Sequence, residues 1–222
     1  MLVRVRLVVP DRPGALGQVA SAIGTAGADV VQVEVIGSEN GRAVDDVHLQ
    51  VRDTAHLDRV VTELAAAAGV SVEGVLHSPP PVTGHAELEL VARLVAQPDR
   101  ALRTLVDGAP AAIGAAWAAL LGATGSRPLD VVDTVVLPGV HAPEVLPEVS
   151  DGLPLRVSSP RLTLDGGRSP AGSVLVPLGT DEPMALVVVR EVGPSFHRSE
   201  TWRLAEIART AGAVAQRTPV AG

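Results

Sequence analysis

Residues 8–35 read VVPDRPGALGQVASAIGTAGADVVQVEV, and this stretch decides the fold of the first part of the chain. The alternating apolar run that leads into it predicts a strand over residues 2–9. Pro13 suits the first position of a helix, where its missing N–H costs nothing. Apolar residues at helical spacing then continue to Thr25, and Gly27 ends the helix because glycine readily takes a positive φ.

The pattern continues through residue 76 with two more strands, a second helix and a last strand. The predicted elements are a strand over 31–35, a turn at 38–41, a strand over 43–51, a helix over 55–68 ended by Gly69, and a strand over 70–76. The order β-α-β-β-α-β is the ferredoxin-like arrangement, an α+β fold with both helices on one face of a four-stranded antiparallel sheet. The other face of this sheet needs polar cover or a partner.

A triple proline at 79–81 cannot join a helix or a central strand, so we expect a linker over residues 77–84. Beyond it we expect a second α+β domain over residues 85–217 and a short tail over 218–222. Its predicted elements are a helix over 86–107 split at Pro98, strands over 130–137, 173–178 and 184–192, and a final helix over 196–216 that Ser195 or Ser199 caps and whose Trp202 faces a core.

The composition excludes several classes of function. The 18 Lys and Arg residues are all arginine and the chain has no cysteine, which removes lysine and thiol chemistry, thiolate metal sites and disulfides. The net charge is −7 with no basic block, and the aromatic residues form no stacking strip, so we expect no nucleic-acid partner. No signal-peptide pattern or apolar run of about 18 residues occurs, so we expect no membrane association and a cytoplasmic location.

The loop between the first strand and the first helix is the candidate ligand site. It consists of Asp11, Arg12, Pro13, Gly14, Ala15 and Leu16. A helix start presents free backbone N–H groups, and the helix dipole favours an anionic group there. A phosphate cradle would need several glycines and often a lysine, whereas one carboxylate needs only two or three N–H groups.

Two residues of this loop leave alternatives open. Gly14 either lets the backbone approach a ligand closely, because it has no Cβ, or simply permits a tight turn. Asp11 caps the helix, holds the ammonium group of a ligand, or does both.

The polar residues form no catalytic or metal-binding pattern. No two of the six histidines lie at i, i+3 or i, i+4, and neither H-E-x-x-H nor G-x-S-x-G occurs. The acid pair Asp45-Asp46 is expected to keep a hairpin edge soluble, and Gln32 and His48 to face outward or towards a partner subunit. We therefore expect no cofactor and a protein that is not an enzyme.

Residues 1–76 resemble an ACT domain. The resemblance rests on residues 5–35, with their D-R-P-G-x-L opening and A-G-A-D helix exit, and on the β-α-β-β-α-β order. It implies a regulatory module that pairs side by side with a second copy and binds a free amino acid at the interface, near the loop of Gly14.

Residues 85–217 resemble a GAF domain more weakly. The resemblance rests on residues 184–216, which read MALVVVREVGPSFHRSETWRLAEIARTAGAVAQ and include an F-x-x-S-E step into the terminal helix. It implies a domain for ligand sensing or dimerisation.

Two hypotheses on function follow from these observations. In the first, the protein is a small-molecule sensor, and an amino acid bound at residues 11–16 of a homodimer acts on the GAF-like domain or on a partner protein. In the second, the chain is a dimerisation or interaction scaffold that binds no metabolite.

Overall fold

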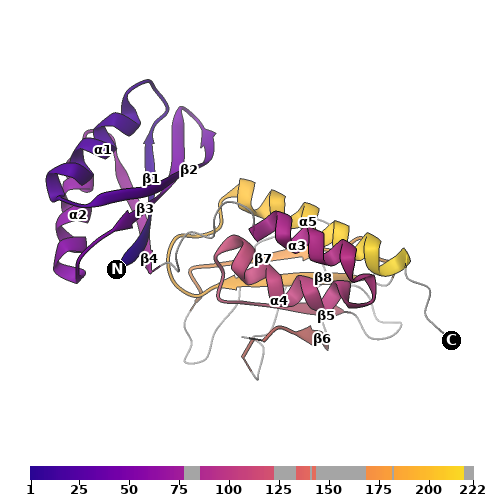
Figure 1. The fold of residues 1–222 in the computed structure, drawn as a ribbon. Helices are drawn as coiled ribbons and strands as arrows, with labels where there is room; N and C mark the ends of the chain where they lie inside the picture. The colour runs from indigo at the N-terminus through magenta and orange to yellow at the C-terminus, as the bar shows by residue number, and fades with distance from the viewer. Residues whose placement is uncertain (78–85, 123–133, 141, 144–168, 182, 218–222) are drawn as a thin grey trace. The chain divides into compact units, whose positions relative to one another are not determined.

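A computed structural model describes residues 1–222 except 78–85, 123–133, 141, 144–168, 182 and 218–222 (Figure 1). The chain divides into two compact units, Met1–Gly84 and His85–Gly222. Residues 78–84 of the expected linker and the expected tail at 218–222 lie outside the described residues, whereas His77 is the last residue of a strand. Among the helices that the structure describes, none has the length and apolar character that crossing a membrane requires.

The first unit is a four-stranded antiparallel sheet with two helices on one face (Figure 1). Its elements are β1 (Leu2–Pro10), α1 (Ala15–Ala26), β2 (Asp29–Glu39), β3 (Arg42–Gln50), α2 (Thr54–Ala66) and β4 (Ser71–His77). The strand order β2-β3-β1-β4 is the ferredoxin-like topology, so the fold class expected for this part of the chain is confirmed.

Alternation along β1 decides which residues form the core of the first unit. The odd-numbered apolar residues face the helices, and Arg4 and Arg6 between them face the other way. The buried cluster on the helix side joins both helices to the two central strands, and includes Val3, Val5, Leu7, Val9, Val19, Ile23, Val47, Leu49, Val60 and Leu64.

The first helix begins two residues later than the sequence predicts. α1 starts at Ala15, and Gly14 takes the N-cap position with φ 87°, a left-handed conformation that favours glycine. Pro13 therefore lies in the preceding turn. Gly27 ends the helix at φ 79° as predicted, because its N–H returns to the carbonyl of Gly24.

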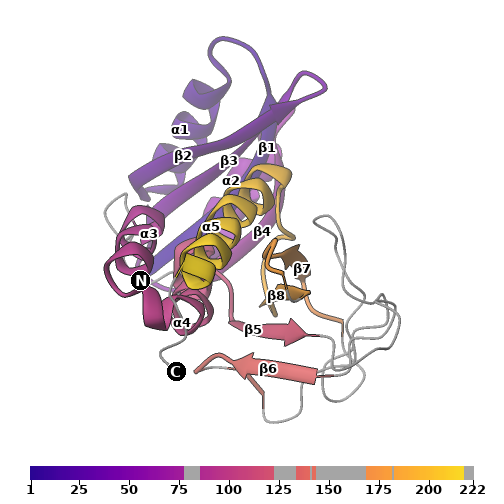
Figure 2. The same ribbon diagram turned by 90° about the vertical axis from the view of Figure 1, so that its right-hand side faces the viewer.

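The second unit is also an antiparallel sheet with helices on one face (Figures 1 and 2). Its elements are α3 (Ala86–Ala96), a 3₁₀ turn (Pro98–Arg100), α4 (Ala101–Ile113), β5 (Trp117–Gly122), β6 (Thr134–Pro138), β7 (Gly172–Pro177), β8 (Met184–Arg190) and α5 (Arg198–Arg217). The sheet order is β6-β5-β8-β7. The α+β class is confirmed, and so is the helix break at Pro98.

β5 lies in the middle of this sheet although the sequence did not predict it. All six of its residues are buried, because both faces of the sheet carry apolar clusters. Leu120 packs towards the helices, whereas Trp117 and Leu121 belong to the cluster on the other face. A strand buried on both faces shows no alternation, which removes the signal that identifies strands in a sequence.

One prediction for α5 is wrong. Trp202 does not face a core but is 64% exposed. The helix starts at Arg198, and the carbonyl of His197 accepts from the N–H of Thr201 at 3.1 Å, while capping by Ser195 or Ser199 stays a prediction. The carboxylate of Glu200 accepts a hydrogen bond from the N–H of His197 at 2.7 Å, which is the side-chain half of a capping box.

Candidate functional site

The predicted ligand loop lies at the surface between β1 and α1. Asp11, Arg12, Pro13 and Gly14 are exposed and Leu16 is 42% exposed, whereas the side chain of Ala15 is buried in the core. Ala15 can therefore offer only its backbone to a ligand, and the other five residues are accessible.

Hydrogen bonds fix the shape of this loop. The N–H of Asp11 donates to the carbonyl of Gly41 at 2.9 Å, and the N–H of Ala15 donates to the carbonyl of Arg12 at 3.2 Å. The carboxylate of Asp11 accepts a hydrogen bond from the hydroxyl of Ser38 in β2. Asp11 thus joins the loop to the edge of the sheet and does not cap α1, which corrects that alternative.

Three backbone N–H groups at the start of α1 remain free. Those of Gly14, Leu16 and Gly17 have no acceptor among the described residues, and the first helical hydrogen bond runs from Gln18 to Gly14. No side chain caps this helix. The start of α1, which is the positive end of the helix dipole, therefore presents three unused donors.

Gly14 is needed for its backbone conformation and not for space. A Cβ placed on Gly14 would meet no atom of the chain within 4 Å, but φ 87° is unfavourable for any residue with a side chain. A Cβ would instead point into the open space where a ligand could approach.

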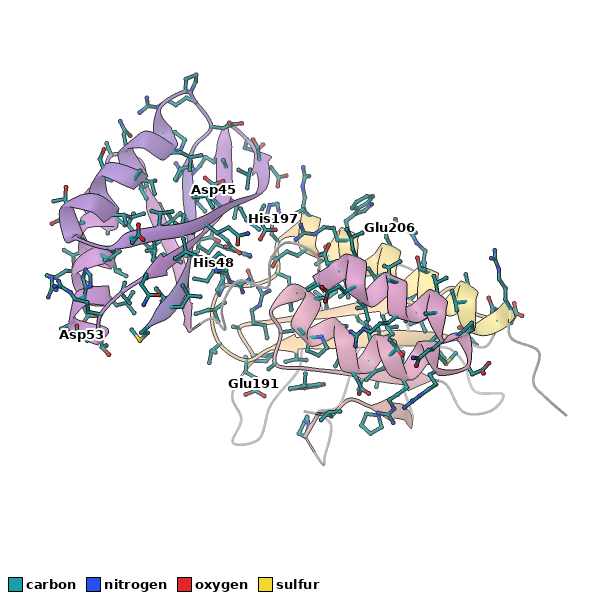
Figure 3. All side chains as sticks on the ribbon, viewed as in Figure 1. Asp45, His48, Asp53, Glu191, His197 and Glu206 are labelled. Atoms are coloured by element: carbon teal, nitrogen blue, oxygen red, sulfur yellow. The ribbon has the colours of Figure 1, made fainter. Side chains whose placement is uncertain are left out.

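Asp45 lies one strand inward from the sheet edge, on the helix side (Figure 3). It stands opposite Leu7 of β1 and Val35 of β2 and is only 1% exposed. Neither of its carboxylate oxygens has a hydrogen-bond partner. Burial above all, and then the nearby carboxylates of Asp46 and Asp11, raise the pKa of Asp45 above its ordinary value.

The expectation that Asp45 and Asp46 keep an edge soluble is therefore wrong. Both side chains are buried, and because they are consecutive residues of a strand they lie on opposite faces of the sheet. Asp46 is fully paired, since Arg6 donates to both of its oxygens at 2.7 Å and Arg4 lies 3.7 Å away. Asp45 and Asp46 thus differ in their contacts although they are neighbours of the same residue type, and the sequence alone did not reveal this difference.

The face of the sheet away from the helices carries polar cover, one of the two alternatives expected for it. Arg4, Arg6, Asp46 and His48 lie there on the central strands. His48 lies on this face, away from the helices, but its side chain is buried and its Nδ1 has no partner. Burial, followed by the nearby guanidinium of Arg4, lowers the pKa of His48.

β2 forms an edge of the sheet and exposes valines along it. Val31, Val33 and Val35 are each more than 40% exposed, and Val35 reaches 62%. The outer side of β2 pairs with no other strand of the sheet that the structure describes. An edge strand of eleven residues with an apolar surface is a site for pairing with another strand.

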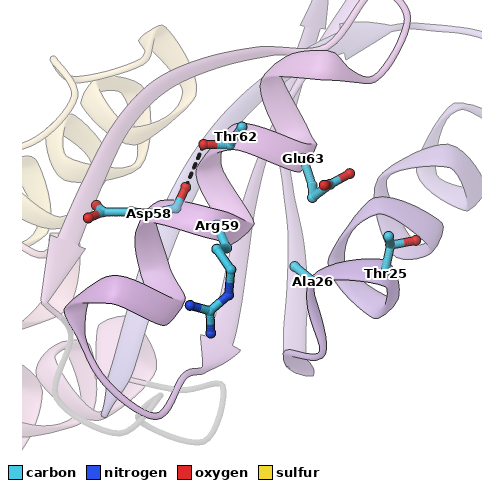
Figure 4. Close-up of a pocket in the computed structure, with 6 residues that line it drawn as sticks. All are labelled: Thr25, Ala26, Asp58, Arg59, Thr62 and Glu63. Carbon is cyan, nitrogen blue, oxygen red and sulfur yellow. Dashed lines mark hydrogen bonds between the residues drawn. The ribbon is translucent and has the colours of Figure 1, made fainter.

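A surface hollow of about 290 Å³ lies between the end of α1 and α2 (Figure 4). Thr25, Ala26, Asp58, Arg59, Thr62 and Glu63 line it. The hydroxyls of Thr25 and Thr62 donate to carbonyls of their own helices, so they are already satisfied. The hollow has no backbone N–H donors comparable to those at the start of α1, and we assign it no function.

The described residues contain no group of three histidine, aspartate or glutamate side chains that could hold a metal ion. His56 is one buried histidine with a structural role. Its Nδ1 accepts from the N–H of Arg52 at 3.1 Å, and its Nε2 lies 3.0 Å from the carbonyl of Ala26 at the end of α1.

The first unit is a ferredoxin-like domain in which no side chain caps the start of α1 and the edge strand β2 pairs with only one other described strand. Residues 1–72 match the family model of the ACT domain. The first unit is therefore an ACT domain, and the resemblance read from the sequence is confirmed for it.

Comparisons of the whole chain give weaker likenesses. No curated protein matches the chain. The ACT domain from GTP pyrophosphokinase of Chlorobium tepidum is 20% identical, with a TM-score of 0.29, over 34% of this chain and 95% of that chain. The GAF domain assigned to a sensor histidine kinase from Pseudomonas syringae pv. tomato is 19% identical, with a TM-score of 0.42, over 59% of this chain and 86% of that chain.

A further structure, assigned to a glycine cleavage system transcriptional repressor, is 10% identical, with a TM-score of 0.33, over 86% of this chain and 80% of that chain. All three TM-scores are below 0.5, so these likenesses carry no argument about function.

Proposed function

We propose that the protein is a small-molecule-sensing regulator whose ACT domain binds a free amino acid at the start of α1. The observation that carries the proposal is the set of three unused N–H groups of Gly14, Leu16 and Gly17. A carboxylate accepting two or three of these hydrogen bonds would replace the missing cap and interact favourably with the helix dipole.

The chemistry around these donors suits a zwitterion. The carboxylate of Asp11, in the same loop, is exposed and is held in place by Ser38. An α-ammonium group could approach Asp11 while the α-carboxylate of the same ligand meets the N–H groups. A phosphate would meet the same donors but would be repelled by Asp11, and no lysine is available to offset that repulsion.

The exposed edge of β2 supports pairing of two ACT domains side by side. Val31, Val33 and Val35 would be covered, and β2 would gain a second neighbouring strand on the side where it pairs with no other described strand. Ser38 and Asp11 connect this edge to the ligand loop, so a ligand at the loop would lie close to the interface. It could then change the population of the paired state if it prefers that state.

In this proposal the ligand acts on the second unit or on a partner protein through the paired ACT domains. The protein is then not an enzyme, needs no cofactor and works in the cytoplasm. The required property is a difference in ligand affinity between two arrangements of the protein.

The test is thermal unfolding of the full chain with each of the twenty amino acids. Far-UV circular dichroism is the suitable signal, because all three aromatic residues of the chain lie in the second unit. A ligand at 100 times its Kd adds about 2.7 kcal/mol, which corresponds to a rise of roughly 2–4 °C per kcal/mol for a chain of this size. A rise with one amino acid supports the proposal, and a flat panel with folded protein contradicts it.

Leu16→Glu is the variant that tests the site itself. It places a carboxylate beside the free N–H groups, where it suits the helix dipole but repels an anionic ligand. Leu16→Gln is the matched neutral control. The ligand-induced rise should be lost in the first variant and kept in the second. Gly14→Val should also lose it, but because valine is strained at φ 87° that variant needs the other two beside it.

The second candidate function, a dimerisation scaffold without a ligand, is favoured by the apolar edge of β2 alone. Val35→Lys should keep the fold, since Val35 is 62% exposed, and should weaken pairing along this edge. Sedimentation of the wild type and of this variant measures the effect. A dimer that Val35→Lys separates, in a chain that responds to no amino acid, would favour the scaffold.

A further inference from the structure

Asp45 is the exception among the buried charged side chains whose contacts the structure describes. The other buried arginines and carboxylates form two pairs, Arg6 with Asp46 and Arg190 with Glu200. Asp45 has no partner on either oxygen, although both oxygens are inaccessible to solvent. Its cross-strand neighbours are Leu7 and Val35, which are both apolar.

Such a side chain is costly for the fold alone. A carboxylate removed from water without compensation destabilises the folded state, and an apolar residue of similar size would pack among Leu7 and Val35 without that cost. Asp45 therefore has no stabilising function within the isolated domain that its contacts reveal. A group from outside the chain that is cationic or donates hydrogen bonds would supply what it lacks.

The position of Asp45 connects it to the ligand loop. Asp11 is near enough to act on it electrostatically, and Asp11 is held by Ser38, which pairs with Ala43 on the same face and two residues along β3 from Asp45. Two carboxylates, Asp11 and Asp45, thus lie in the same part of the domain and repel each other. Their mutual repulsion is relieved by positive charge between them or on them.

Three arginines of the first unit are engaged elsewhere, and neither oxygen of Asp45 accepts a hydrogen bond from Arg12 of the loop or from any other described residue. Arg42 donates to the carbonyls of Val8 and Gly69, each at 3.0 Å. Arg4 and Arg6 lie on the opposite face of the sheet beside Asp46. The positive charge that Asp45 lacks is therefore not supplied by these side chains.

The strand pairing near Asp45 is irregular in β2 and between β1 and β4. β2 shifts register between Val35 and Gly37, directly beside the pair Val35–Asp45. β1 and β4 shift register at Leu7, the other neighbour of Asp45. Such a shift interrupts the regular ladder and bends the strand locally, so the backbone beside Asp45 departs from regular pairing.

From this juxtaposition we infer that the ligand is an amino acid with a cationic side chain, and that Asp45 receives that side-chain cation. The inference rests on the proposed function, since the α-carboxylate meets the N–H groups of Gly14, Leu16 and Gly17 and the α-ammonium group meets Asp11. The ligand then carries two positive charges for two carboxylates and one negative charge for the helix start. The edge of β2 at Val35 moves aside to admit the side chain.

The test compares cationic amino acids with neutral counterparts of similar shape. The probes are L-lysine, L-ornithine and L-arginine against L-norleucine, L-norvaline and L-citrulline, with affinity measured by calorimetry on the full chain. At least one cationic amino acid should bind about 10- to 100-fold more tightly than its neutral counterpart, the range expected when a buried charged group is left unpaired. In Asp45→Asn this ratio should fall close to one.

Three variants make the result specific. Asp45→Ser gives a second substitution in case the amide packs poorly, and it should lose the preference as well. Asp58→Asn removes an exposed carboxylate of α2 in the same unit and should leave the preference unchanged. Leu16→Glu should abolish binding of every amino acid, whatever its side chain.

The outcomes separate the inference from the proposed function. If a neutral or acidic amino acid binds best and Leu16→Glu abolishes that binding, the proposed function holds and the inference is wrong. An unchanged preference in both Asp45 variants also overturns the inference. If no amino acid binds to the wild type or to Leu16→Gln, the proposed function itself fails.

Discussion

The starts of α1 and α5 differ in whether a side chain accepts hydrogen bonds from their free backbone N–H groups. Both expose N–H groups that the helix cannot satisfy. At α5 the carboxylate of Glu200 accepts from the N–H of His197. At α1 no side chain does so, and the N–H groups of Gly14, Leu16 and Gly17 stay free. The capped start of α5 therefore stabilises the fold, whereas the uncapped start of α1 keeps N–H donors that a ligand could use.

The buried charged residues of the two units differ in a similar way, because one is paired and the other is not. Arg190 donates to the carbonyls of Ile113, Gly114 and Pro194 and to Glu200, and its guanidinium lies 4.1 Å from the ring centroid of Phe196. This cluster joins the end of α4, the end of β8 and the start of α5. Asp45 in the ACT domain has no such partner. The contacts of Arg190 are explained by the stability of the fold, whereas a partner for Asp45 has to come from outside the described chain.

The largest expected effect comes from breaking the paired cluster. Glu200→Ala leaves Arg190 as a buried charge without its carboxylate, and should cost about 3–5 kcal/mol of the free energy of unfolding. Urea unfolding followed by tryptophan fluorescence measures this, because Trp117 is buried in the same unit. Glu206→Ala is the control: it removes an exposed partner of Arg209 and should cost less than about 1 kcal/mol. Equal losses in the two variants would contradict the role given to Glu200.

A smaller effect is expected at the helical glycines of the two units. A Cβ on Gly212 of α5 would lie 2.5 Å from the carbonyl oxygen of Leu178, so Gly212→Ala should cost about 1–3 kcal/mol. A Cβ on Gly24 of α1 would meet nothing within 4 Å, so Gly24→Ala should stabilise its unit by up to about 1 kcal/mol. Urea titrations by far-UV circular dichroism should show these opposite signs. A lower free energy of unfolding in Gly24→Ala would contradict the open space predicted around Gly24.

Asp45→Asn is expected to stabilise the ACT domain without ligand at neutral pH. The pKa of Asp45 is raised by burial, so folding favours its neutral form. The free energy of unfolding is then highest below the ordinary pKa of an aspartate, and it falls as the pH rises through the raised pKa. The gain in Asp45→Asn should be present at pH 7 and shrink towards pH 3, as thermal midpoints across this range would show. If the difference in thermal midpoint between Asp45→Asn and the wild type did not change with pH, titration of Asp45 would not be its cause.

The smallest expected effect is that of closing the open helix start. Leu16→Glu adds a negative charge to the first turn of α1 and should stabilise the unliganded chain by about 0.3–1 kcal/mol. Thermal unfolding without ligand at low and at high salt measures this gain, which salt should reduce. A destabilised variant would show that the exposed part of Leu16 contributes packing.

Much of the ACT domain could be predicted from its sequence, because the signals are local. Alternation in β1, helical spacing after Gly14 and the glycine at residue 27 act within a few residues of the chain. The same signals fail for β5, whose six buried residues do not alternate. They also fail for Trp202, whose apolar character suggested a core position although the tertiary packing leaves it exposed.

The sequence by itself determined the order of elements in the first unit, the loop at residues 11–16 and the residue types available there, since each depends on neighbouring residues. Only the tertiary structure decided that Asp46 meets Arg6 while Asp45, its neighbour in the chain, meets nothing. It also decided that Asp11 binds Ser38 and leaves α1 uncapped. The physical reason is that satisfaction of a buried polar group depends on strands brought together from distant parts of the chain.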